Sequence, residues 1–310
     1  MELRHFRSFV AVAEELHFGR AAERLHIAQP ALSRQIRQLE RDLDVQLFTR
    51  TKRRVELTEA GRVFLPEARQ TIDQAARAAR AAQRSVRGEI GRLEVSFVPS
   101  ATHEVLPPIF GAFHERFPDV VIVPRQMTTS EQLQALTDDK IGIGCVCLPA
   151  GADGQMLETM GNDENLVIEP LQRESLRLVI PAAHPLAAAA VVSRCDLAGE
   201  PFVLFRRDLE PSLYAGYVAL CAEGGFAPNV VTDEANSTLT MVSLAAAGLG
   251  LSLIPATAQN QRRSRVVYRT MEPALPKVWI VAVWRRDDPS PTLRSFLDVV
   301  RATPRQPTAA

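Results

Sequence analysis

One short segment near the amino terminus, residues 29–43, constrains this chain more than any other. Four apolar residues recur in it at three- and four-residue steps, and at about 100° per residue they fall within about 40° of one another: Leu32, Ile36, Leu39 and Leu43. This stripe predicts a helix that is buried on one face. The opposite face is polar and basic, and it carries Pro30, Ser33, Arg34, Arg37, Gln38 and Arg41.

The residues before this segment predict two further helices. Apolar periodicity favours a helix over residues 2–15 and a short helix over residues 20–26, and a tight turn follows at Ile27-Ala28. A short helix, a tight turn and a second helix form the helix-turn-helix unit that places its second helix in the major groove of DNA. Pro30 fits a first helical turn because its missing N–H would have no intrahelical partner there.

The exposed face of the third helix predicts direct contacts with DNA. Gln29, Ser33 and Arg34 lie in its first turns, where Gln can pair with adenine and Arg with guanine. Pro30 lies on the same face, and Arg37 is expected to contact phosphates. For an arbitrary amphipathic helix, a merely solvated face would be the better interpretation. The preceding short helix and turn favour DNA binding instead.

A basic stretch after this helix predicts a wing. Four of its five residues are cations, and such a stretch can contact the phosphate backbone or the minor groove: Arg50, Thr51, Lys52, Arg53 and Arg54. The alternative is a solvated loop. Residues 1–91 hold 17 Lys and Arg against 12 Asp and Glu, whereas residues 92–310 hold 19 against 24, so the two parts carry +5 and −5. Local cations of this kind suit a nucleic-acid-binding front end.

Other bulk features exclude several classes of protein. The sequence has no basic-then-apolar signal peptide and no apolar stretch near the roughly 20 residues of a membrane span, so we expect a cytoplasmic protein without membrane partners. Four cysteines at irregular spacing predict neither a disulfide framework nor a metal site.

A long helix is predicted after the wing. Thr58 is a plausible N-cap, and the helical pattern continues to about residue 87. One narrow, alanine-rich stripe runs along it, comprising Phe64, Ala68, Ile72, Ala75, Ala79, Ala82 and Val86. A helix of this length spans about 45 Å and cannot bury its stripe against an 80-residue partner. We therefore expect a dimerisation helix, the alternative being a monomeric linker.

The remainder predicts an α/β body of two lobes with a cleft between them. The expected fold class is α/β with an N-terminal all-α winged helix-turn-helix. The expected divisions are the DNA-binding domain at 1–58, the linker helix at 59–88, lobe I at 92–164 and 269–303, lobe II at 165–268, and a flexible tail at 304–310.

No catalytic constellation is predicted in this body. Gly248-Leu249-Gly250 lacks the last glycine of a dinucleotide fingerprint, and Cys145 and Cys147 alternate along a strand rather than forming a redox pair. We therefore expect a binding protein rather than an enzyme. An enzyme would need a catalytic pair, and a transporter's solute-binding protein would need an export signal and no helix-turn-helix.

Five motifs together resemble the LysR-type transcriptional regulators. They are Ala21-Ala22-Glu23-Arg24-Leu25, Gln29-Pro30-Ala31-Leu32-Ser33-Arg34-Gln35-Ile36, Leu39-Glu40, Leu47-Phe48-Thr49-Arg50 and Leu57-Thr58-Glu59-Ala60-Gly61. The match is specific over residues 1–65 and looser beyond. Ala28 stands where this family commonly has a capping Ser, which costs about 1 kcal/mol, and Asp44 stands where it has Gly.

The resemblance implies a sequence-specific transcriptional regulator, in the group that controls degradation of aromatic compounds. It implies a winged helix-turn-helix, a linker helix and an effector domain similar to type 2 periplasmic binding proteins. The implied partners are double-stranded promoter DNA, further copies of the chain as a homodimer or homotetramer, and a small-molecule co-inducer, with RNA polymerase left open and no other cofactor. Activator and repressor roles are both compatible with the resemblance.

The resemblance also places an effector between the lobes. The implied contacts lie at two strand-to-helix junctions and on a segment across the cleft, at Ser100, Ala101, Thr102, Thr129, Phe202, Val203 and Phe205. Hydroxyls beside helix N-termini suit a carboxylate, and Phe202 could cover an apolar ring. We expect a small organic acid, aromatic-derived in the manner of muconate or benzoate. A simple helix cap is an equally open role for Ser100.

Overall fold

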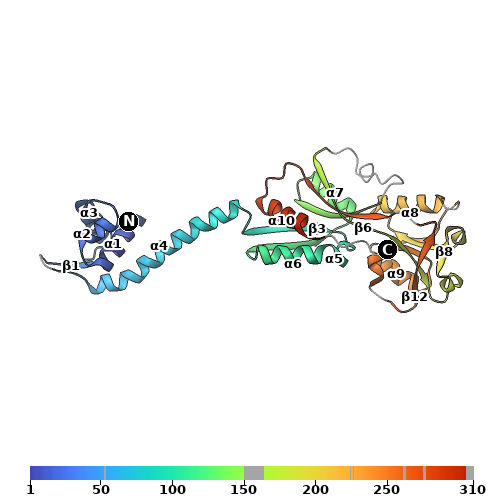
Figure 1. Cartoon of the computed structure of the whole chain (residues 1–310), viewed down its shortest axis with the longest axis horizontal. Helices are drawn as coiled ribbons and strands as arrows, with labels where there is room; N and C mark the ends of the chain where they lie inside the picture. Colours follow the sequence, from blue (N-terminus) through green and yellow to red (C-terminus); the bar gives the residue numbers. More distant parts are fainter. Residues whose placement is uncertain are drawn as a thin grey trace. The chain divides into compact units, whose positions relative to one another are not determined.

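The structure is a computed structural model that describes residues 1–51, 54–149, 164–223, 225, 227–260, 263–274 and 277–304. The chain forms two compact units, Met1–Arg84 and Ser85–Ala310 (Figure 1).

Three helices, α1 (Leu3–Glu15), α2 (Phe18–Arg24) and α3 (Gln29–Leu43), form the amino-terminal part of the first unit. The predicted stripe of α3 is confirmed, because Leu32, Ile36 and Leu39 are fully buried and Leu43 packs beside them. The residues at both ends of α3 behave as the sequence predicted. Ala28 is the N-cap without a side-chain hydrogen bond, Pro30 lies in the first turn, and Asp44 adopts the left-handed conformation at φ 54°.

Aromatic rings hold the first unit together. The Phe9 ring is completely buried, and its centroid lies 5.0 Å from that of Phe64 and 5.3 Å from that of Phe48. Phe6 also contacts Phe64, at 5.5 Å. Phe64 belongs to the next helix, α4 (Glu59–Val86), so the start of α4 is anchored in the core formed by α1 and β1.

Two short antiparallel strands, β1 (Phe48–Arg50) and β2 (Val55–Leu57), form the predicted wing. Thr58 caps α4 as expected, because its hydroxyl accepts from the Gly61 N–H at 3.0 Å and donates to the Gln46 carbonyl oxygen at 2.7 Å. Within the described part of α4, Gly61 and Ala68 are buried, whereas Ala79, Ala82 and Val86 of the predicted stripe are exposed.

The second unit contains a five-stranded sheet of order β4-β3-β5-β13-β6, which defines lobe I. Its strands are β3 (Gly91–Phe97), β4 (Val120–Gln126), β5 (Ile143–Pro149), β6 (Leu166–Glu174) and β13 (Val278–Arg285). Strands β4 and β5 run parallel to β3, and β13 runs antiparallel to β5 and β6. The remaining elements are α5 (Ala101–Glu104), α6 (Leu106–Arg116), α7 (Thr129–Thr137) and α10 (Pro291–Ala302).

Helices cover both faces of this sheet. On β5, Cys145 and Cys147 point into the cluster that includes α6 and α10, where the rings of Phe113 and Phe296 lie 5.2 Å apart. The alternate residue Val146 belongs to a separate cluster with Leu136 of α7. Burial on both sides explains the near-continuous apolar sequence of this strand.

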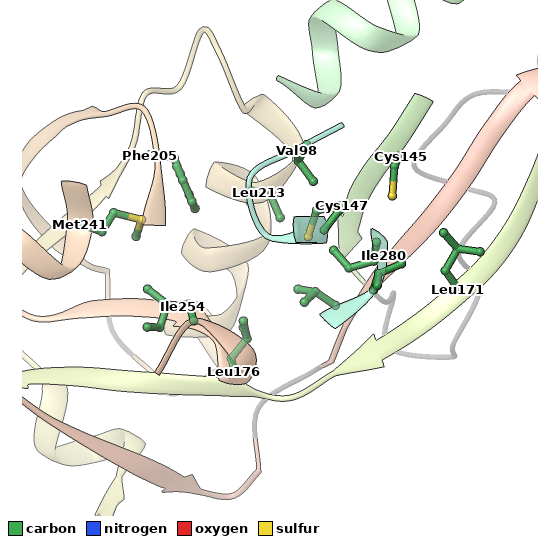
Figure 2. Packing of buried hydrophobic residues seen from close by; sticks show 14 of the residues in the cluster. Val98, Cys145, Cys147, Leu171, Leu176, Phe205, Leu213, Met241, Ile254 and Ile280 are labelled. Atoms are coloured by element: carbon green, nitrogen blue, oxygen red, sulfur yellow. The ribbon is translucent and has the colours of Figure 1, made fainter. Parts of the chain in front are cut away.

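Lobe II is built on a second sheet of order β11-β7-β12-β8, flanked by a parallel pair. The elements are β7 (Leu176–Pro181), η1 (Pro185–Ala188), β8 (Val191–Ser193), η2 (Arg194–Leu197), β9 (Pro201–Phe205), α8 (Pro211–Glu223), β10 (Asn229–Ala235), α9 (Thr238–Ala246), β11 (Ser252–Pro255), η3 (Ala256–Asn260) and β12 (Val266–Glu272). A bridge between Phe202 and Leu251 joins β9 to β11. Figure 2 shows the apolar packing shared by the two lobes.

The structure corrects the expected lobe boundaries. Strand β6 pairs with β13 and therefore belongs to lobe I, which extends past residue 164 to Glu174. Strand β12 pairs with β7 and β8, so lobe II extends past residue 268 to Glu272. Buried and exposed residues do not alternate clearly along β6 or β12, so the sequence pattern gave no sign of the sheet to which each strand belongs. Of the predicted tail at 304–310, residues 305–310 lie outside the described residues.

Every described helix is too short or too polar to cross a membrane.

We predict opposite effects from two glycine-to-alanine substitutions in helices. At Gly61 the added Cβ would meet the backbone carbonyl oxygen of Leu47 well inside van der Waals contact, so Gly61→Ala should destabilise the first unit by about 1–3 kcal/mol. At Gly111, exposed in α6, the Cβ meets nothing within 4 Å, and Ala should stabilise by about 0.5–1 kcal/mol. Thermal unfolding of both variants tests the pair, and a neutral Gly61→Ala would contradict the close approach of α4 to Leu47.

Candidate functional site

The polar face of α3 is exposed as predicted. Gln29, Pro30, Arg34 and Arg37 are exposed, and Ser33 is half-buried. The Nε of Arg37 donates to the Ser33 carbonyl oxygen at 3.2 Å, which directs this side chain along the helix. The structure therefore brings the five predicted residues together on one surface of the first unit.

The wing cations have different environments. Arg54 is exposed and pairs with Glu56 at 2.8 Å, whereas Lys52 and Arg53 lie outside the described residues. The guanidinium of Arg50 pairs with the carboxylate of Glu40 at 2.6 Å and lies 5.0 Å from the centroid of the Phe18 ring, although its side chain keeps 30% of its surface exposed. The phosphate contact of Arg50 therefore stays a prediction, made by a side chain that already has one partner within the domain.

Glu40 is a residue that sequence reasoning did not single out. It lies on the buried side of α3 with 4% of its surface exposed. One carboxylate oxygen accepts from the backbone N–H groups of Leu47 and Phe48, at 3.0 and 3.2 Å, and the other accepts from Arg50. One buried charge thus joins α3 to the first strand of the wing, and its hydrogen bonds offset the cost of burial.

A broad concavity of about 1060 Å³ lies beside α3 in the first unit. Its described lining contains one histidine, His5, one glutamate, Glu40, and five arginines. The arginines are Arg4, Arg34, Arg37, Arg41 and Arg50. Arg4 was not predicted, although its place just before the apolar stripe of α1 is visible in the sequence. Cations of this density create a positive surface next to the exposed helix face.

A second, much smaller cavity of about 30 Å³ lies in the second unit, and we call it the interlobe cavity. Lobe I contributes Val98, Pro99, Ser100 and Cys147, and lobe II contributes Phe205, Glu210, Leu213, Tyr217, Asn236, Ser237, Thr238 and Pro255. Figure 2 shows Val98, Cys147 and Leu213 converging from different elements. The cavity therefore joins segments that are far apart in sequence.

Three hydroxyl-bearing side chains in this cavity are more than nine-tenths buried: Ser100, Tyr217 and Thr238. Ser100 stands at the N-cap position of α5, but its hydroxyl caps no helix N–H. The simple capping role is therefore wrong. The hydrogen bonds described for this chain do not use these three hydroxyls, and none of the three oxygen atoms is among the fully buried atoms without a partner. Hydroxyls that keep access to a cavity can offer hydrogen bonds to a ligand or to water.

Only some of the predicted effector contacts line the interlobe cavity. Ser100 and Phe205 line the cavity, while Ala101 is buried inside α5. Thr102 is exposed, and its hydroxyl donates to the Pro99 carbonyl oxygen at 2.7 Å. Phe202 and Val203 are completely buried in the apolar core and do not line the cavity, so the structure does not bring these two predicted contacts to it.

Thr129 is buried and donates its backbone N–H to a carboxylate oxygen of Glu210 at 3.1 Å. Burial raises the pKa of the Glu210 carboxyl, and the hydrogen bonds from Thr129 partly oppose this shift. A similar pair lies between Glu174 and Thr257, whose hydroxyl donates at 2.7 Å, and burial also raises the pKa of Glu174. Each carboxylate joins one lobe to the other.

Sequence reasoning missed Glu210, Tyr217 and the segment Asn236-Ser237-Thr238. The last of these could have been found, because Ser237 caps α9 by accepting from the Thr240 N–H and stands at a strand-to-helix junction like that of Ser100. Glu210 and Tyr217 carry no local signal. In the described part of the chain, no group of His, Cys, Asp and Glu is suited to hold a metal ion.

Family models match both parts of the chain. Residues 3–62 match the model described as a bacterial regulatory helix-turn-helix protein of the lysR family. Residues 87–305 match the model described as the LysR substrate binding domain.

Similar proteins match over nearly the whole chain. The HTH-type transcriptional regulator AlsR of Bacillus subtilis is 38% identical, over 96% of this chain and 95% of that protein. The Hca operon transcriptional activator HcaR of Escherichia coli is 36% identical, over 97% of each. The crystal structure of full-length CbnR with its target DNA has a TM-score of 0.78 at 27% identity, covering 98% of this chain and 99% of that one. The crystal structure of full-length BenM has a TM-score of 0.55 at 28% identity, covering 99% of this chain and 100% of that one. The chain therefore belongs to the LysR-type transcriptional regulators, DNA-binding proteins with a substrate-binding domain of two α/β lobes.

Proposed function

We propose that this regulator contacts promoter DNA through the exposed face of α3 and responds to a small organic acid bound in the interlobe cavity. The observation that carries the effector assignment is the set of three hydroxyl-bearing residues, each more than nine-tenths buried, that line one cavity. The exposed cationic face of α3 carries the DNA assignment.

The proposed DNA contacts follow from exposure and side-chain chemistry. Gln29, Ser33 and Arg34 would contact base edges, because they occupy the first turns of α3. Arg37 and Arg54 would contact phosphates, as would Lys52 and Arg53 by their place in the sequence. Pro30 would lie against the DNA backbone. The CbnR crystal structure with target DNA supports the same partner for this chain.

Glu40 would act on DNA binding by positioning rather than by contact. The Glu40 carboxylate fixes the backbone at Leu47 and Phe48, where the chain leaves α3 and enters the wing. Its pair with Arg50 fixes the end of β1 at the base of the wing loop. The two DNA-contacting surfaces would thereby keep one relative orientation.

The organic-acid assignment rests on the polarity of the cavity. Hydroxyl donors and the N-terminal end of the α9 dipole favour an anion, and apolar side chains such as Val98, Leu213 and Phe205 would contact its carbon skeleton. The described lining contains no Lys, Arg or His, so the charge of the acid would be balanced by hydroxyls and dipoles alone. An aromatic acid is in keeping with relatives such as the Hca operon activator.

We propose that α4 pairs with its copy in a homodimer, and that dimers associate into a homotetramer. Val86 of the predicted stripe is 77% exposed, and the alanines between residues 79 and 82 are unburied in the single chain. A long helix with an uncovered apolar seam is stabilised by a second helix. Closure of the lobes on the acid would then shift the packing of the assembly and the spacing of its DNA-binding domains.

Two arginines should affect DNA binding differently. Arg34→Ala should reduce discrimination between operator and altered sequences by about 1–3 kcal/mol, because a bidentate base contact is lost. Arg54→Ala should weaken binding to all sequences and lower the slope of log affinity against log salt by about 1. Gel-shift titrations at several salt concentrations measure both, with the exposed β3 residue Arg92→Ala as control. Wild-type behaviour of both variants would contradict the assigned interface.

The Glu40 pair gives a third DNA-binding prediction. Glu40→Gln should lower the stability of the first unit by about 1–3 kcal/mol, because the Arg50 guanidinium loses its carboxylate. The same change should weaken DNA binding without altering the salt slope, since no phosphate contact is removed. Glu23→Gln, at an exposed site on α2, is the control. A lower salt slope in Arg50→Ala would confirm Arg50 as a phosphate contact.

The effector proposal is tested by calorimetry with benzoate and related acids. Binding should be detected with the wild-type chain and weakened about tenfold by Ser100→Ala, because one hydrogen bond to the carboxylate is lost. Ser243→Ala, on α9 with its hydroxyl bonded to the Leu239 carbonyl oxygen, should bind like wild type. Failure of every acid to bind, with no protection of the cavity from hydrogen exchange, would reject the organic-acid assignment.

A further inference from the structure

We propose that Glu210 is the specificity-determining residue of the interlobe cavity and that it restricts the effector to acids with a single carboxylate. This inference rests on the proposed organic-acid function. It concerns the number of negative charges that the cavity accepts, which follows from where the protein places its own carboxylate.

Glu210 already occupies one of the anion-binding positions. Thr129 is the first residue of α7, and its N–H is one of the donors that a helix N-terminus leaves without an intrahelical partner. The family resemblance implied that a ligand would use this junction. In the structure, the donor is taken by the Glu210 carboxylate, which arrives from the start of α8 in the opposite lobe and is only 8% exposed.

The position of Glu210 is fixed by its own backbone. Its N–H donates to the Arg206 carbonyl oxygen at 3.0 Å, and its carbonyl oxygen accepts from the Tyr214 N–H at 2.9 Å. The residue therefore joins the turn after β9 to the first turn of α8. With the backbone fixed in this way, the carboxylate is held at the cavity wall by the Thr129 N–H at 3.1 Å.

Three further hydrogen-bonding groups of the cavity belong to other residues. They are the Ser100 hydroxyl of lobe I and the Tyr217 and Thr238 hydroxyls of lobe II, all on residues that are more than nine-tenths buried. Thr238 is also the first residue of α9, so the positive end of that helix dipole lies beside its hydroxyl. These groups provide a place for one ligand carboxylate.

A second ligand carboxylate would have no cation to balance its charge. The described lining contains no cationic side chain, and apart from the hydroxyls and the Asn236 amide its walls are largely apolar. The charged group left in the lining is Glu210 itself, which would repel another carboxylate across a poorly hydrated space.

The test uses two pairs of acids that differ only in the second carboxylate. Sorbate and trans,trans-muconate share one diene chain, and benzoate and terephthalate share one ring. Calorimetric titrations of the full-length chain are made at mildly alkaline pH, where a free carboxyl is ionised. The wild-type chain should bind the monocarboxylate of at least one pair about tenfold or more tightly than its dicarboxylate.

Glu210→Gln removes the charge and keeps an oxygen that can accept from the Thr129 N–H. This variant should bind the dicarboxylate of the same pair about tenfold more tightly than wild type, with little change for the monocarboxylate. Glu131→Gln is the matched control, because the Glu131 carboxylate likewise accepts a backbone N–H at the N-terminus of α7, that of Thr128 at 2.8 Å, but is exposed and outside the cavity. Thermal unfolding verifies that both variants are folded, and Glu210→Asn, whose shorter side chain carries no charge, replaces Glu210→Gln if that variant is not.

The outcomes separate the two proposals. If monocarboxylates and dicarboxylates bind the wild-type chain equally, or if Glu210→Gln leaves their ratio unchanged, the role of Glu210 is overturned while the organic-acid function stands. If no acid binds either the wild-type chain or the variant, the organic-acid function fails and this inference fails with it. A dicarboxylate gain in Glu210→Gln that is absent in Glu131→Gln supports the assignment.

Discussion

The pairing of β13 with both β5 and β6 is the constraint on which the second unit depends. Because β13 comes near the end of the chain, lobe I stays incomplete until lobe II has been built. The chain must therefore cross between the lobes at Ser175 and again after Glu272. These crossings place the junction at Ser100 opposite the junction at Thr238, and the interlobe cavity is the result.

The features that the sequence predicted correctly depend on neighbours a few residues apart. The buried stripe of α3 needs only helical periodicity. The missing cap at Ala28, the left-handed Asp44 and the capping hydroxyl of Thr58 are likewise decided within one helical turn. The exposed face of α3 follows from the stripe, because whatever is not buried must face away. This is why most proposed DNA contacts could be named in advance.

The features that could not be predicted depend on contacts between distant segments. Arg50 looks like any other wing cation until the fold brings it to Glu40, and nothing near Glu210 indicates a partner 81 residues away. Strand β9 raises a different difficulty, because every residue from Phe202 to Phe205 is buried. Apolar sequence alone cannot say that Phe205 faces the cavity while Phe202 faces the core.

The small size of the interlobe cavity also has a kinetic consequence. A space of about 30 Å³ is comparable to the volume of one water molecule, so any larger ligand would enter this cavity only when the lobes separate. Separation breaks the contacts of Glu210 with Thr129 and of Glu174 with Thr257. The rate of ligand association would then be limited by how often these contacts open rather than by diffusion, and the same contacts would lengthen the residence time of a bound ligand.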